Sequence, residues 1–277
     1  MTQRPDPFRS VAPFRALTEH THVSSVAFLD EDTPSELTVG LVVGTESALL
    51  VDAGSTPEQG RLLAAAAGRV TSVPVTTVVL THAHVDHAYG IVGVGADTVL
   101  AHEAARDELG ADPDAPALPD RTVAVAAAVD LGGGVRVEIV HLGRGHTAGD
   151  LVVVVPSDDA VFAGDLVESA GPPQLGPDSY AHDWPATLDG LIGLTTDRSV
   201  VVPGHGPVMT RQDVFEQRGR LAAVSGEISR LAGLGTGVDD AESRGDWALP
   251  FVAVRAGYAA ACRQARAAEP VRRLPVL

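Results

Sequence analysis

The segment THAHVDH, residues 81–87, places three histidines and one aspartate directly after TTVVL, an apolar run typical of a buried strand. In an extended segment, residues two apart point to the same side, so His82 and His84 can hold one ion together. Asp86 and His87 follow where the chain must turn, and they can face a second ion nearby. The segment is therefore either a polar loop at the end of a strand or a metal site.

Three later motifs also place an imidazole or a carboxylate at the end of an apolar run. His146 lies in GRGHTAGD, Asp165 in FAGDLV and His205 in PGHG. The neighbouring glycines allow the backbone to approach closely. Imidazole and carboxylate ligands suit zinc, and also iron or manganese. Two neighbouring ions would need a bridging carboxylate, for which Asp165 is the natural candidate.

The order of apolar runs predicts an α+β protein built as a four-layer αββα sandwich, because the half that ends near His87 and the half that ends near His205 have similar patterns. We expect a single domain over 1–277, in which 210–277 forms a C-terminal helical appendage. Expected strands cover 23–30, 37–43, 47–52, 76–80, 135–142, 150–156, 160–165 and 199–206, and expected helices cover 56–70, 103–109, 184–194, 210–233 and 247–268. A loop is expected over 166–184.

The composition limits which partners, metal sites and cellular compartment we expect. The formal charge of -16 arises from 36 acidic and 20 basic residues, and such a field repels phosphate backbones, so we expect no nucleic-acid partner. The chain has no lysine, so a cationic substrate anchor must be arginine or the metal itself. The single cysteine, Cys262, excludes a disulfide framework and a Cys-based zinc finger. No apolar run has the length of a signal peptide or of a membrane span, which predicts a cytoplasmic protein without a membrane partner.

Taken together, the motifs resemble the metallo-β-lactamase superfamily over about residues 23–206. His82 to His87 match its HxHxDH signature, and the other motifs follow in the family's order, with Asp52 in LLVDAG. The resemblance implies metals at one edge of the sandwich. By motif matching, the first metal would be bound by His82, His84 and His146, the second by Asp86, His87 and His205, and both by the bridging Asp165.

Two divalent ions, zinc before iron or manganese, would lower the pKa of a shared water from about 15.7 toward 7 and so supply a bound hydroxide. Asp86 would be the catalytic residue that orients this nucleophile. The residues expected to hold the ligands or the turn geometry are Asp52, Thr81 and Thr147. The candidates for contact with substrate are Glu168, Tyr180 and Trp184.

Asp165 and Glu168 bear on the substrate. The β-lactamases of the family usually have Cys or Ser at the position of Asp165, and quorum-type lactonases place Tyr where this chain has Glu168. We therefore expect a dinuclear metal-dependent hydrolase that acts on a small ester, thioester or lactone. The alternative is an oxidoreductase similar to the persulfide dioxygenases, with one non-haem iron. The expected partner is a small-molecule substrate, with a homodimer as a possible assembly.

Overall fold

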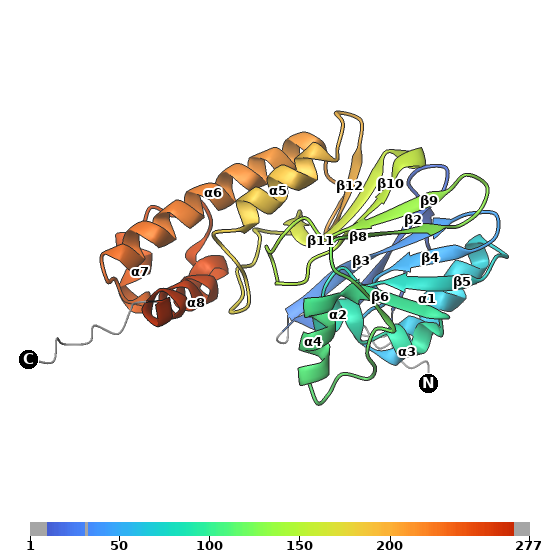
Figure 1. Cartoon of the computed structure of the whole chain (residues 1–277), viewed down its shortest axis with the longest axis horizontal. Coiled ribbons are helices and arrows are strands. Elements are labelled where there is room, and N and C mark those ends of the chain that lie inside the picture. Colours follow the sequence, from blue (N-terminus) through green and yellow to red (C-terminus); the bar gives the residue numbers. More distant parts are fainter. Residues whose placement is uncertain (1–9, 31–32, 269–277) are drawn as a thin grey trace, which may run out of the picture.

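The computed structural model describes residues 10–30 and 33–268. Two β-sheets stack face to face, and helices cover the outer face of each (Figure 1). A dry layer of Val, Leu and Ile side chains, including Val51, Ile139 and Val153, fills the space between the sheets. This arrangement confirms the predicted αββα sandwich.

The first sheet has seven strands in sequence order. Strands β1 to β4 pair antiparallel, whereas β4, β5, β6 and β7 pair parallel. The parallel strands send their carboxyl ends to one edge of the sheet, where β5 delivers the THAHVDH segment. The strands are β1 (Arg15–Ala16), β2 (Thr21–Asp30), β3 (Thr33–Val43), β4 (Ala48–Val51), β5 (Val75–Val79), β6 (Thr98–His102) and β7 (Arg121–Val123).

The second sheet has the order β12-β11-β10-β9-β8. Strands β11 and β12 are its one parallel pair among the described residues, and both end at the same edge as β5. The strands are β8 (Ala126–Asp130), β9 (Arg136–Val140), β10 (Val152–Val155), β11 (Ala160–Glu168) and β12 (Val200–His205), with a 3₁₀ turn, η2 (Pro156–Asp158), between β10 and β11.

Helices α1 (Pro57–Val70), α2 (Val85–Ala88), α3 (Ile91–Val94) and α4 (Glu103–Ala111) lie on the side of the first sheet. The second sheet is covered by α5 (Trp184–Gly193) and α6 (Arg211–Gly233). Helices α7 (Val238–Arg244) and α8 (Phe251–Ala268) follow, and α6 to α8 extend past the sandwich (Figure 1). One hydrophobic cluster joins β10 and β11 to α5, α6 and α8, with Trp184 and Tyr258 as its largest buried side chains.

Helix boundaries follow local chemistry. The side chain of Thr56 accepts a hydrogen bond from the backbone N–H of Gln59 at the start of α1, and Thr210 and Asp213 form a capping box at the start of α6. Helix α8 begins directly after Pro250, where the sequence also indicates a break in the expected helix 247–268, and residues 247–249 are not helical. Proline can occupy the start of a helix but not its interior.

The predicted elements do not include the strands β1, β6, β7 and β8 or the helices α2, α3 and α7. They are short, and their apolar residues do not form a clear period. The expected domain limits 1–277 and 210–277 include residues 1–9 and 269–277, which lie outside the described residues. The single domain and its helical appendage stay predictions.

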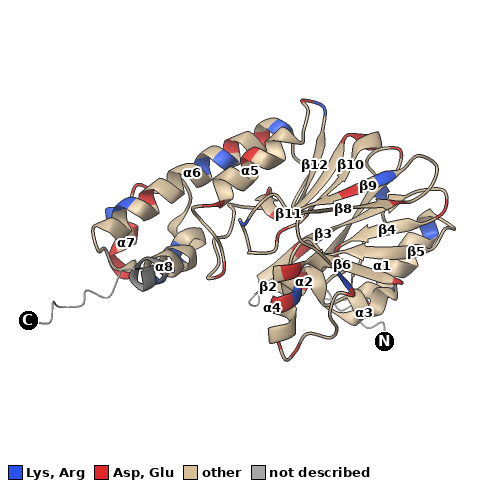
Figure 2. Ribbon diagram, in the orientation of Figure 1, with Lys and Arg blue, Asp and Glu red and all other residues tan. Residues whose placement is uncertain are grey.

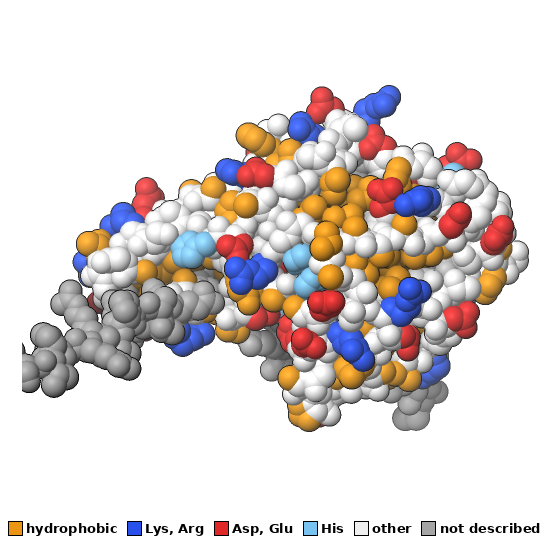
Figure 3. All heavy atoms as spheres, in the orientation of Figure 1, with side chains coloured by type: hydrophobic (Ala, Val, Ile, Leu, Met, Phe, Trp, Pro, Cys, Tyr) orange, Lys and Arg blue, Asp and Glu red, His pale blue; other side chains and the backbone are white. Residues whose placement is uncertain are grey.

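Charged residues are scattered over the molecule. Figure 2 shows Asp and Glu spread over both sheets' connections and over α6 and α7, with scattered arginines. Figure 3 shows hydrophobic side chains gathered over β8, β9 and β10 on the face in view. Val125, directly before β8, is 69% exposed. In the described part of the chain, no helix combines the length and the apolar character needed to cross a membrane.

Candidate metal centre

Strand β5 and helix α2 position the first four predicted ligands. The chain leaves β5 at Val79, carries His82 to the sheet edge, and starts α2 directly after His84, whose backbone is extended. Asp86 and His87 then lie on α2, so the turn expected at this point is a helix start. The rings of His82 and His84 approach each other edge-on, with centroids 4.6 Å apart.

The second sheet delivers the other three. His146 lies in the loop between β9 and β10, Asp165 lies within β11, and His205 ends β12. Strand β11 shifts its register against β12 around Gly164, which has a φ of 52°. A side chain at Gly204 on β12 would collide with the Asp165 carboxylate, so the close approach of β12 to Asp165 requires glycine there.

These side chains form two groups that share one edge of the sandwich. In each group the candidate ligand atoms lie within 4.8 Å of one another. Nε2 of His146 is 3.0 Å from Nδ1 of His84 in one group, and Nε2 of His205 is 3.3 Å from Oδ2 of Asp86 in the other. The groups are His82, His84, His146 and Asp165, and Asp86, His87 and His205.

The Asp165 carboxylate faces both groups. Its Oδ1 atom is 3.2 Å from Nε2 of His87, and its Oδ2 atom is 3.4 Å from Nε2 of His146. Oδ2 is also 3.4 Å from Nε2 of His205. This position between the groups is the one that a bridging ligand requires.

The centre has the properties of a cation site. Nε2 of His82, Nε2 of His87 and Oδ1 of Asp165 are buried and have no hydrogen-bond partner in the described structure. Buried polar atoms are normally paired, and atoms left unpaired are costly unless a bound group satisfies them. Imidazole and carboxylate donors fit zinc, iron or manganese, so the residues present fit a pair of divalent ions.

Electrostatics agrees with that fit. Burial raises the pKa of Asp165, but the facing imidazoles of His87 and His205 lower it well below its ordinary value. Burial lowers the pKa of His205, but Asp165 and Asp86 raise it to about 12. Burial and the neighbouring imidazoles lower the pKa of His82 well below its ordinary value, so this ring is neutral and its nitrogen is free to bind a metal. The site thus holds the Asp165 carboxylate ionised and favours positive charge beside it.

Asp52 and Thr81 contact the Nδ1 atoms of the His87 and His82 imidazoles. Asp52 follows β4 and accepts a hydrogen bond from Nδ1 of His87 at 2.8 Å. Its carboxylate also accepts from the backbone N–H and the hydroxyl of Thr81 at 2.8 and 2.9 Å. The Thr81 hydroxyl is 3.1 Å from Nδ1 of His82. Both residues therefore lie where residues that orient metal ligands are expected.

Thr147 forms hydrogen bonds within the loop that carries His146. Its backbone N–H and its hydroxyl donate to Asp150 at 3.1 and 2.8 Å, which fixes the turn that carries His146. Within the described structure these bonds hold the loop and not an imidazole, so of the two roles expected for Thr147 the structure favours the turn geometry.

Asp178 is a residue that the sequence does not single out. Nε2 of His84 donates to Oδ2 of Asp178 at 2.8 Å, which leaves Nδ1 of His84 facing His146. Glu108 also places a carboxylate oxygen within 4.8 Å of His84 and Asp178 but is exposed. Asp178 sits in the long loop before α5, 94 positions from His84, and no spacing in the sequence connects the two.

The three substrate-contact candidates have different surroundings. Glu168 is the last residue of β11 and not part of the expected loop, and burial and the Asp165 carboxylate raise its pKa well above its ordinary value. Tyr180 is half-buried, with the Arg144 guanidinium 4.3 Å from its ring centre. Trp184 is fully buried, and its indole N–H donates to the backbone oxygen of Leu166. Its ring packs edge-on against that of His146, with centroids 5.6 Å apart, and a contact of Trp184 with substrate stays a prediction.

A cavity of about 500 Å³ opens beside the centre. Asp86 lines it together with Phe28, Leu29 and Val85. The Asp86 side chain is 16% exposed, whereas that of His87 is fully buried. Of these two, Asp86 is therefore the residue that solvent and a bound molecule can reach.

Known proteins share this fold and these motifs. The family model described as "Metallo-beta-lactamase superfamily" matches residues 33–205. The chain belongs to the metallo-β-lactamase superfamily, as its motifs suggested.

The chain is similar to "Metallo-beta-lactamase type 2" of Bacillus sp. (strain 170), with 30% identity over 190 residues that cover 68% of this chain and 72% of the relative. The protein of the same name in Bacillus cereus is 29% identical over 193 residues, which cover 69% and 74%. Among solved structures, a metallo-beta-lactamase from Pontibacter korlensis aligns with a TM-score of 0.68 and 25% identity, covering 76% of this chain and 98% of its own.

Proposed function

We propose that this protein is a metal-dependent hydrolase that uses two divalent ions, zinc in the first place, to cleave a small ester, thioester or lactone. The observation that carries the proposal is the position of Asp165, whose two oxygens face two separate groups of imidazole and carboxylate ligands. The first ion would be held by His82, His84 and His146, the second by Asp86, His87 and His205, and both by Asp165.

When bound, the ions would lower the pKa of a water molecule and polarise a carbonyl oxygen of the substrate. Asp86 would act as the general base. Its Oδ2 atom faces His87 and His205 at 3.4 and 3.3 Å, and its side chain lines the adjoining cavity. Asp86 would accept the proton of the reacting water as the water oxygen bonds to the acyl carbon. The C–O or C–S bond then breaks, and the leaving group takes up a proton.

The adjoining cavity supports an ester or thioester with an apolar acyl group. Phe28, Leu29 and Val85 form its apolar wall beside Asp86, and Leu29 and Val85 are 41% and 50% exposed. The names of the relatives make β-lactams a substrate class to be tested. Asp165 at the shared ligand position is the residue that favours esters, thioesters and lactones over β-lactams.

Metal analysis of the purified protein, combined with hydrolysis assays, tests the proposal. About two zinc ions per chain and a chelator-sensitive activity on esters, thioesters or lactones, restored by zinc, support it. A metal-free protein with unchanged activity contradicts it. One iron per chain with oxygen uptake on a persulfide would instead establish the dioxygenase alternative, and preferred hydrolysis of β-lactams would overturn the proposed substrate class.

A further inference from the structure

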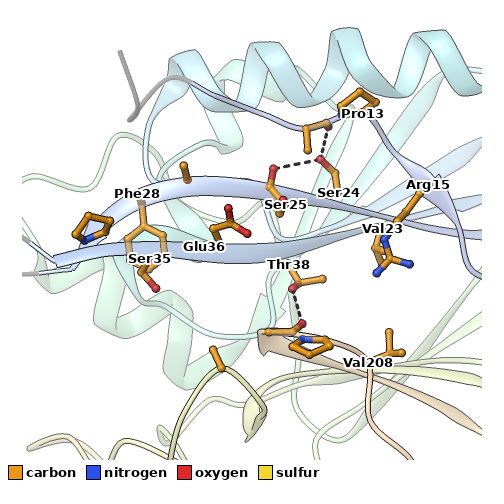
Figure 4. A pocket seen from close by; sticks show the side chains of 16 residues that line it. Pro13, Arg15, Val23, Ser24, Ser25, Phe28, Ser35, Glu36, Thr38 and Val208 are labelled. Atoms are coloured by element: carbon orange, nitrogen blue, oxygen red, sulfur yellow. Dashed lines mark hydrogen bonds between the residues drawn. The ribbon is translucent and has the colours of Figure 1, made fainter. Parts of the chain in front are cut away.

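A second and larger cavity adjoins the centre. It is a groove of about 800 Å³ between β2, β3, the segment before β1, and the loop after β12 (Figure 4). Phe28 lines both this groove and the cavity beside Asp86. Its ring also lies 5.6 Å from the ring of His205. The groove therefore borders the metal centre at Phe28.

The register of β2 and β3 gives the order of side chains along the groove. Phe28 pairs with Ser35, Ala27 with Glu36, and Ser25 with Thr38. At the far end, Arg15 of β1 pairs with Val23. Figure 4 shows Arg15 and Phe28 at opposite ends, with Glu36 and Thr38 between them.

The two charged side chains of the groove lie at different distances from Phe28. Glu36 lies one pair from Phe28, and its backbone oxygen accepts the Nδ1 hydrogen of His205 at 2.9 Å. Arg15 lies at the opposite end, is exposed, and makes no ion pair with any of the described residues. The protein carries a formal charge of -16, which repels anions. An arginine without an ion-pair partner is therefore the position in the groove that attracts an anionic group of a ligand.

We propose that this groove binds the leaving-group arm of the substrate, and that the arm ends in a carboxylate or phosphate held by Arg15. The acyl group would occupy the cavity beside Asp86, and the scissile bond would lie near Phe28. Phe28 lies five residue steps along β2 from Val23, and at about 3.3 Å per step this sets the arm's reach at roughly 17 Å. The inference rests on the proposed hydrolase function.

The Glu36 carboxylate restricts how short an anionic arm can be. A short arm would place its anion beside the Glu36 carboxylate, where like charges repel. A long arm passes Glu36 and reaches Arg15. The preference for a terminal anion should therefore reverse sign between short and long arms.

The experiment compares thioesters with one apolar acyl group and a set of thiol arms. The arms have either two carbons or a reach of about 17 Å, and they end in a neutral amide, a carboxylate or a phosphate. We expect kcat/KM for the long anionic arm to exceed that for the long neutral arm by roughly five-fold, mainly through KM. The short anionic arm should be poorer than the short neutral one.

Variants assign the effects to residues. Arg15→Gln should remove the advantage of the long anionic arm, and Glu36→Gln should remove the penalty on the short one. Arg121→Gln is the matched control, because Arg121 is also an exposed arginine on an edge strand without an ion pair in the described structure, but lies at the other end of the first sheet. It should keep both effects.

A binding measurement separates this inference from the proposed function. The S-methylated long arm cannot be hydrolysed, and isothermal titration calorimetry should show it binding wild type and Arg121→Gln several-fold more tightly than Arg15→Gln. Either anion supports the proposal and identifies the terminal group. Equal binding to all three proteins, or an anion preference that is unchanged in Arg15→Gln, overturns the inference even if neutral thioesters are hydrolysed.

Discussion

Nδ1 of His87 lies 2.8 Å from Oδ2 of Asp52, although helix α1 and strand β5 separate the two residues in the chain. Asp52 has a φ of 67°, in the left-handed region that asparagine and aspartate tolerate better than most residues. The backbone at this position thus presents the carboxylate to His87, and the imidazole is fixed with Nε2 toward Asp86 and Asp165.

This relationship predicts the effect of Asp52→Asn. Asparagine keeps the backbone conformation and volume, but its amide nitrogen cannot accept the hydrogen bonds that both carboxylate oxygens accept. We expect zinc affinity of the second group to fall roughly 10- to 100-fold. Competition with a chromogenic chelator measures it, with Asp107→Asn as a control, because Asp107 is exposed on α4. Equal affinities in the two variants would show that Asp52 does not position His87.

A second prediction concerns Asp178 and His84. Asp178→Ala removes the acceptor of the His84 Nε2 hydrogen, which leaves this imidazole free to rotate. We expect weaker zinc binding in the first group, by roughly 10-fold, and partial recovery in Asp178→Asn. Glu108→Gln is the matched control. Glu108 also has a carboxylate oxygen within 4.8 Å of His84, but the hydrogen bond of His84 Nε2 goes to Asp178. If Glu108→Gln weakens zinc binding as much as Asp178→Ala, the effect comes from charge and not from orientation.

The third prediction concerns Asp86. Asp86→Asn should lower kcat by roughly 100-fold or more, since the amide cannot accept the proton of the reacting water. Metal content is measured on the same preparation, and activity is expressed per loaded chain. Unchanged turnover at full loading would remove Asp86 from the mechanism, and a loss explained by metal content would leave it only as a ligand.

The fourth prediction lies at the edge of the sandwich opposite the metal centre. The Asp158 carboxylate accepts hydrogen bonds from the Thr18 hydroxyl and from the backbone N–H of His20, and so ties the turn before β2 to the turn after β10. Burial raises the pKa of Asp158, but these hydrogen bonds lower it below its ordinary value. We expect Asp158→Asn to lower the free energy of unfolding by about 1 kcal/mol at neutral pH.

The pH dependence of that difference follows from the lowered pKa. The stabilisation is present above the ordinary carboxyl pKa of about 3.9 and is lost as the pH falls through the lower value of the folded state. Urea unfolding of wild type and Asp158→Asn from neutral to acid pH should therefore show a gap that closes only below about pH 4. A gap that is constant across this range would contradict the role of the ionised carboxylate.

The fold was largely predictable because its central strands are continuous runs of apolar and β-branched residues. Strand β5, Val75–Val79, and its counterpart β12 can be recognised by composition alone, since strands buried on both faces need no polar alternation. Helix α7 and strand β7 are too short for such a signal, and strand β8, Ala126–Asp130, is mostly alanine. Strand β11 continues to Glu168 because a buried pairing with β12 extends it, and pairing between distant strands has no local signature.

The ligand positions were predictable for a related reason. Each lies at or near a strand end, and the ends of parallel strands meet at one edge. Asp178 was missed because its contact with His84 depends on how a long loop folds back. The burial of Trp184 could not be predicted because a tryptophan at a loop end can point to solvent or to the core, and only the packing of α5 on the second sheet decides.

The seven candidate ligands divide between the two sheets: four follow β5, and three lie in or between strands of the second sheet. Ions at this edge would join the two sheets in addition to the apolar layer between them and the hydrogen bonds from His205 to Glu36 and from Thr18 to Asp158. Removing them should loosen the rim before the interior, so amide hydrogens near His146 and α2 should exchange faster after chelation while those of Val78 and Val153 keep their protection.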